Sequence, residues 1–152
     1  MIVTIVNQAG PAQHGVLSES LARLRAHSGR KVLLLDTQRE RRGLVRAQLH
    51  GGCAGADAGG FQRAYDDVVI EADAGDALLC RRALAAAEVV VVALAPHTET
   101  ALLRRLTARL SDAQASNPAM RLLLACPAKG KACDVDPGDV ARLYRAAFGQ
   151  GA

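Results

Sequence analysis

Short, almost continuously apolar runs alternate along the chain with longer segments in which apolar residues recur at helical spacing. Apolar runs of about four to eight residues are typical of strands that are buried on both faces of a sheet. The alternation of strand and helix predicts right-handed crossovers and a parallel sheet with helices on both faces. The five predicted strands are Ile2–Val6, Lys31–Leu35, Asp67–Ile70, Val89–Leu94 and Arg121–Ala125.

Helical spacing predicts four helices among these strands. The first carries apolar residues at positions 16, 17, 21 and 24 and ends at Gly29, which is expected to follow its C-terminus. Asp76 is expected to cap the second, Ala77–Ala87, and a leucine stripe predicts a third from about Thr98 to Ala113. The last begins at Asp136-Pro137, because proline suits the first helical turn. We therefore expect one α/β domain over residues 1–152, a three-layer sandwich with a five-stranded parallel sheet.

Composition narrows the choice of functions. Half of the 152 residues are apolar but only 3% are aromatic, so the core is built from Leu, Val and Ala, and exposed ring platforms for single-stranded nucleic acid are excluded. No apolar run is long enough to span a bilayer, and no charged leader precedes the first strand, so we expect a cytoplasmic protein without membrane insertion. The cysteines lack metal-ligand spacing, and we expect no metal centre. The net charge of +4 is compatible with acidic partners.

Polar residues with site-forming chemistry follow the first three predicted strands. In an open parallel sheet, ligands bind at the carboxyl ends of the strands. The first strand runs into Asn7–Gly15, the second is followed by Asp36, and the third by Glu71 and Asp73. These three carboxylates are expected to lie near one another, and a divalent cation site is one alternative for them. The other alternative is that these carboxylates are solvated and accept hydrogen bonds from loop N–H groups.

The same segments carry a resemblance to a family. Met1–Gln8 resembles the strand that leads into the phosphate loop of the ParA/MinD chromosome-partitioning ATPases, which are P-loop proteins with a deviant Walker A motif. Gly29–Thr37 is similar to the second strand of that family, and Tyr65–Glu71 to its Walker B strand. Ala83–Pro96 is similar to the helix and strand that follow. The resemblance implies the strand order 2-3-1-4-5 and a site for ATP and Mg²⁺ at positions Gly10, Pro11, Gln13, His14, Gly15, Asp36 and Glu71.

Those positions depart from the chemistry of the family. Gly10 is retained, but Pro11 lacks an N–H donor and Gln13 adds a side chain where the loop carries glycine. His14 stands in place of the lysine that reaches the phosphates, and Gly15 in place of the hydroxyl that binds Mg²⁺. Ala9 replaces the signature lysine that reaches across the dimer, and Glu71 is one methylene longer than the Walker B aspartate. We therefore expect no catalytic residues, no bound cofactor and no ATPase activity.

The resemblance and its departures predict a degenerate ParA/MinD-like protein that acts as an accessory or regulatory binding partner in partition, positioning or a related assembly. Any homodimer or heterodimer is expected to form without nucleotide. One alternative is a divergent nucleotide-binding ATPase that uses ATP and Mg²⁺. A second alternative is a DNA-associated module, since clustered arginines neutralise phosphates without reading sequence. The arginines of that patch, which would equally suit a protein partner, are Arg39, Arg41, Arg42 and Arg46.

Overall fold

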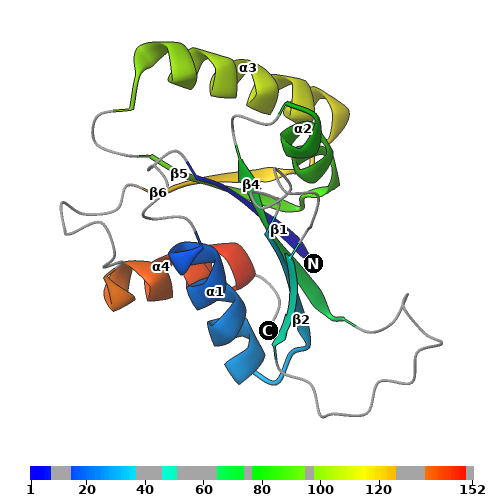
Figure 1. Cartoon of the computed structure of the whole chain (residues 1–152), viewed down its shortest axis with the longest axis vertical. Helices are drawn as coiled ribbons and strands as arrows, with labels where there is room; N and C mark the ends of the chain where they lie inside the picture. The colour runs from blue at the N-terminus through cyan, green and yellow to red at the C-terminus, as the bar shows by residue number, and fades with distance from the viewer. Residues whose placement is uncertain are drawn as a thin grey trace.

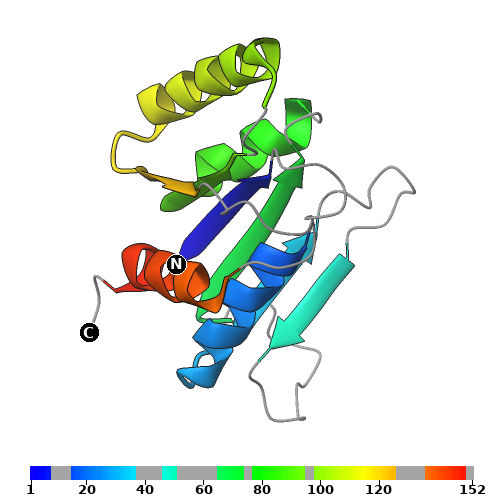
Figure 2. The ribbon, with the colours of Figure 1, turned by 90° about the vertical axis from the view of Figure 1, so that its left-hand side faces the viewer.

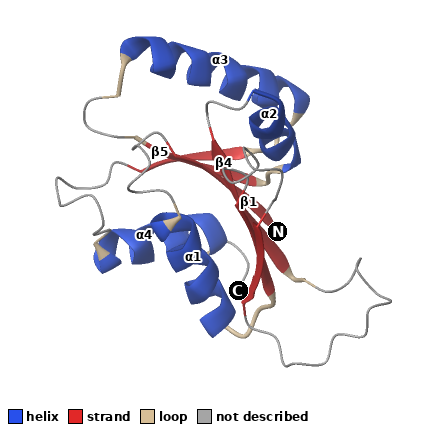
Figure 3. Cartoon of the chain, in the orientation of Figure 1, coloured by secondary structure: helices blue, strands red, loops and turns tan. Residues whose placement is uncertain are grey.

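The computed structural model describes residues 1–7, 15–36, 46–50, 65–73, 77–94, 98–125 and 136–149. Within these ranges the chain forms one sheet with two helices on each face, a three-layer α/β sandwich (Figures 1 and 3). The elements in chain order are β1 (Ile2–Asn7), α1 (Val16–His27), β2 (Val32–Asp36), β3 (Arg46–His50), β4 (Asp67–Asp73), α2 (Ala77–Ala86), β5 (Val89–Ala93), α3 (Thr100–Ser116), β6 (Arg121–Ala125) and α4 (Pro137–Phe148).

The strands lie in the order β3-β2-β4-β1-β5-β6. Five of them are parallel and follow one another as β2-β4-β1-β5-β6, which confirms the predicted parallel sheet and its order 2-3-1-4-5. The prediction of only five strands was incomplete. β3 adds a sixth strand, antiparallel to β2 at the edge of the sheet, and its arrow in Figure 2 points against that of β4. Its sequence, Arg-Ala-Gln-Leu-His, lacks the apolar run that identifies a strand buried on both faces.

Two apolar clusters fill the space between the sheet and its helices. On one face, Val3 and Ile5 of β1 pack with Leu21 of α1 and Phe148 of α4. On the other face, Val90 and Val92 of β5 pack with residues of α2 and α3. Alternate residues of one strand therefore enter opposite clusters, as the two-residue period of a strand requires. The fully buried valines of β5 explain why that strand reads as an unbroken apolar run.

A buried ion pair ties the first helix to the sheet. Arg25 of α1 donates to Asp67 Oδ2 at 2.7 Å, and the Asp67 side chain is only 1% exposed. Arg30 lies 3.2 Å from the same oxygen, and the Met1 amino nitrogen lies 3.2 Å from Oδ1. The Arg25 guanidinium also lies 4.8 Å from the centre of the Phe148 ring, so one side chain joins α1, β4 and α4.

The helix ends follow the sequence in most respects. Gly29 has φ +84°, the left-handed conformation expected after a C-terminus, and the Asp136 side chain accepts the Gly138 N–H at 2.7 Å as the cap of α4. The inward stripe predicted for α1 was wrong at Leu24, which is 39% exposed, because positions 17, 18, 21 and 22 form the buried face of the helix. The predicted cap Asp76 lies outside the described residues. None of the described helices combines the length and apolarity needed to cross a membrane.

Candidate functional site

The candidate site lies where β4 meets the first turn of α1. Glu71 and Ile5 are paired in the register of β4 and β1, and Glu71 therefore faces the same side of the sheet as Ile5, which packs under α1. α1 begins directly after Gly15, and its first N–H groups have no partner within the helix. The alternation of β4 thus brings a carboxylate under the positive end of a helix.

The Glu71 carboxylate closes this helix end. Its Oε1 accepts the Gly15 backbone N–H at 2.7 Å, and its Oε2 accepts the Ser18 hydroxyl at 2.7 Å. The residue is 3% exposed and Ser18 is 1% exposed, so the contact is shielded from water. Hydrogen bonds to an ionised acceptor are stronger than neutral ones, and the helix dipole adds to them. Glu71 thereby supplies the N-terminal cap that no side chain of α1 provides.

Gly15 has the backbone conformation that this contact requires. Its φ of +89° and ψ of −29° fall in the left-handed region, which glycine enters without steric cost. A Cβ on Gly15 would lie 3.8 Å from Glu71 Oε2, an ordinary contact, so the backbone angle and not crowding is what favours glycine there. Gly15 therefore takes part in this site as a backbone donor.

Sequence reasoning missed Ser18. Among the four buried residues of α1, positions 17, 18, 21 and 22, it is the one with a polar side chain. A hydroxyl on an otherwise apolar buried face signals a polar partner in the sheet, because a buried hydroxyl without one is costly. The Glu71 carboxylate is that partner, and Ser18 is also 3.1 Å from the Gly15 carbonyl oxygen.

Asp36 lies beside Glu71 in the sheet. It is the last residue of β2, half-buried, and pairs in register with Glu71 on β4 and with Arg46 on β3. Residues paired across adjacent strands face the same side, so the expectation that Asp36 and Glu71 lie near each other is met. Asp73 is two positions further along β4, in register with Asn7. Of the alternative of solvated carboxylates bonded to loop N–H groups, the solvation was wrong for Glu71, which is buried, whereas the bond to a backbone N–H is present at Gly15.

Most of the other predicted site residues lie outside the part of the chain that the structure describes. Gly10, Pro11, Gln13 and His14 lie outside the described residues, as do Arg39, Arg41 and Arg42 of the arginine patch. Of Arg46 the structure gives only its place as the first residue of β3. Among the described residues, no three histidine, cysteine or acidic side chains are grouped in a way that suits a metal ion.

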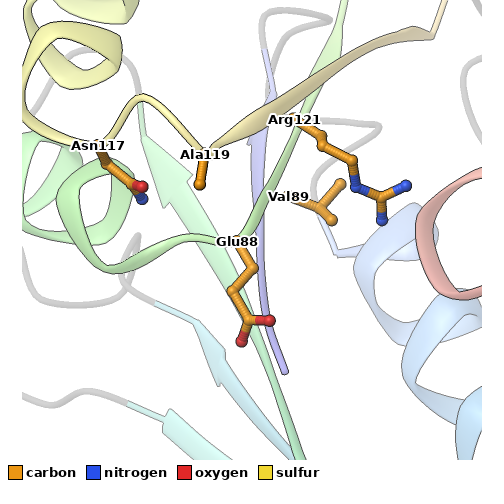
Figure 4. A pocket seen from close by; sticks show the side chains of 5 residues that line it. All are labelled: Glu88, Val89, Asn117, Ala119 and Arg121. Carbon is orange, nitrogen blue, oxygen red and sulfur yellow. The ribbon is translucent and has the colours of Figure 1, made fainter. Parts of the chain in front are cut away.

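A hollow lies at the amino-terminal edge of the sheet, opposite the edge that carries the candidate site (Figure 4). It measures about 310 Å³, and its polar side chains bond within the fold: Glu88 accepts the Ile2 N–H at 3.0 Å, and Asn117 donates to the Ala87 carbonyl at 2.8 Å. The Arg121 guanidinium points toward α4 and donates to the carbonyl of Ala147 at 2.7 Å. These groups join elements to one another, and we assign the hollow a structural role. Its lining residues are Glu88, Val89, Asn117, Ala119 and Arg121.

Comparison with known proteins does not identify a family for this chain. No protein-family model matches the chain, and no curated protein matches it. The fold and the contact of Glu71 with α1 are therefore the basis on which function is argued.

Proposed function

We propose that the protein is a partner-binding member of the ParA/MinD type that neither binds ATP tightly nor hydrolyses it, and that serves as an accessory in partition, positioning or a related assembly. One observation carries the proposal: the Glu71 carboxylate already occupies the N-terminal end of α1. That end is where a P-loop protein holds phosphate, because the free N–H groups and the dipole both favour an anion.

An internal carboxylate opposes a bound triphosphate in two ways. It uses the Gly15 N–H and the Ser18 hydroxyl, the donors that a phosphate oxygen would need. It also adds a negative charge to a shielded position, where repulsion between like charges is weakly screened. The sequence removes further donors, since Pro11 has no N–H and His14 replaces the phosphate-binding lysine. Each of these changes weakens the binding of a triphosphate.

Calorimetry with Mg-ATP tests the proposal. We expect the wild-type protein to show no micromolar affinity and no turnover. A triple variant Pro11→Gly/Gln13→Gly/His14→Lys combined with Glu71→Ala is expected to gain measurable affinity, because it restores donors and removes the internal carboxylate. The same triple variant with Glu71 kept is the matched control and should gain less. Gly15→Thr is left out, because a β-branched residue is strained at φ +89°.

Two outcomes would contradict the proposal. Micromolar binding of Mg-ATP by the wild type, with turnover that Glu71→Ala abolishes, would favour the divergent ATPase. Salt-dependent DNA binding that is lost when Arg39, Arg41, Arg42 and Arg46 are neutralised together would favour the DNA-associated module.

A further inference from the structure

The two helical layers carry their charges in different ways. α2 and α3 together contain five arginines and a single carboxylate, Asp112. α1 and α4 contain four arginines, of which Arg23, Arg25 and Arg142 pair with carboxylates. By contrast, Arg81, Arg82, Arg104 and Arg105 are exposed and form no ion pair with any residue that the structure describes. Most arginines of α1 and α4 are therefore paired, whereas these four of α2 and α3 are not paired within the described residues.

These arginines share one layer of the molecule. α2 and α3 contact each other and lie on the same face of the sheet, opposite α1 and α4 (Figures 1 and 3). Arg81 and Arg82 come from α2, and Arg104 and Arg105 come from α3. Like charges that remain together on a surface repel one another and favour an anionic partner.

Exposed apolar and small residues lie beside these arginines on α2 and α3. Leu78 is 59% exposed, and it precedes Arg81 and Arg82 by three and four positions, which places all three along one side of α2. Ala85 continues that side, and Ala101 and Ala108 are exposed on α3. Arginine is enriched at protein interfaces, which have an apolar centre within a polar rim, and an exposed leucine beside arginines fits that arrangement. A phosphate backbone would gain nothing from Leu78.

We propose that the outer surface of α2 and α3 binds an acidic, amphipathic segment of a partner protein. The acidic side chains of that segment pair with Arg81, Arg82, Arg104 and Arg105, and one of its apolar side chains covers Leu78. The inference rests on the proposed function, since it names the surface and the partner chemistry through which a protein without ATPase activity would act.

The test uses a labelled, helix-forming peptide of about five turns, with a stripe of leucines at i, i+3 and i+4 and glutamates on both flanks of that stripe, so that both kinds of side chain reach one surface. Fluorescence anisotropy with the full chain is expected to show micromolar binding that weakens as salt is raised. The variant Arg81→Ser/Arg105→Ser should bind at least about tenfold more weakly, since truncated interface arginines are among the costliest losses. Neither side chain forms an ion pair with a residue in the described part of the chain, so the variant should unfold at the wild-type temperature.

The control Arg23→Ser/Arg145→Ser removes the same charge from the opposite layer, and its affinity should stay within about twofold, as a surface ion pair contributes little. Equal loss in both variants would overturn the inference, because net charge alone would then explain binding. Duplex DNA that binds more tightly than the peptide, or no peptide binding at low salt, would also overturn it. The proposed function is tested separately by Mg-ATP calorimetry. A failure of that proposal can therefore be told apart from a failure of this inference.

Discussion

The Glu71 carboxylate and the Gly15 N–H, 56 residues apart in the chain, meet at 2.7 Å and close the N-terminus of α1 from within the sheet. The contact joins the end of β4 to the helix that follows β1. An internal carboxylate thus closes this helix end, and the stability of this corner depends on that side chain.

Glu71→Ala is expected to lower the free energy of unfolding by about 2–4 kcal/mol, because the Gly15 N–H and the Ser18 hydroxyl both lose their buried acceptor. Urea unfolding measures the change. Glu99→Ala is the control: Glu99 precedes α3 without a side-chain cap bond, and its loss should change stability by less than about 0.5 kcal/mol. Equal effects at the two positions would contradict the role assigned to Glu71.

Ser18→Ala is expected to cost about 1–2 kcal/mol, since Glu71 Oε2 loses a donor in a shielded position. Ser20→Ala on the same helix is the matched control. Ser20 donates to the Val16 carbonyl within its own helix, a bond that adds little to stability. Thermal unfolding of the two variants under one condition separates them, and a larger loss at Ser20 would refute the prediction.

Substitution of glycine at a left-handed position carries a backbone cost. Gly15→Ala and Gly29→Ala are each expected to destabilise the fold by about 1–2 kcal/mol, because φ lies at +89° and +84°. Gly29→Asn should cost less, since asparagine tolerates this region better. Chemical unfolding of the three variants measures the order, and an alanine at position 29 as stable as asparagine would contradict it.

Acid should weaken the link between α1 and β4. Burial raises the pKa of Asp67, but its hydrogen bonds with Arg25, the terminal amino group and Arg30 outweigh burial and hold that pKa below the ordinary 3.8. A carboxyl with a lowered folded pKa contributes stability above its unfolded pKa. That contribution is lost as the pH falls from about 4 through the folded value. Stability measured from pH 6 to pH 2 should therefore drop more steeply in the wild type than in Asp67→Asn, and equal slopes in the two proteins would contradict this prediction.

Nucleotide should not drive self-association. In a ParA-type sandwich dimer, the strand ends that carry Asp36, Glu71 and Asp73 would face their copies with no lysine at position 9 to offset the charge. Like charges brought into a shielded interface disfavour association. Light scattering is expected to give the same mass with and without Mg-ATP. A mass that doubles only with nucleotide would refute this prediction and the proposed function.

The sequence by itself determined the parallel sheet, because the central strands β1 and β5 are largely buried and the runs in β2, β4 and β6 are also mostly apolar, although Leu122 and Leu124 of β6 are exposed. It also placed Gly29 and Asp136 at helix ends, since capping depends on neighbours in the chain. The strand order came only with the family resemblance, and the sheet confirms it.

Only the tertiary structure decided what the strand ends do. β3 pairs at an edge, where a strand needs no apolar run, so its local sequence did not reveal it. The sequence placed Glu71 at a strand end, but it did not show that the carboxylate reaches Gly15 and Ser18, because these contacts join residues more than 50 positions apart. Whether an arginine is paired likewise depends on which helices share a face. Local interactions are encoded by spacing along the chain, whereas contacts between distant elements exist only once the sheet and helices have packed.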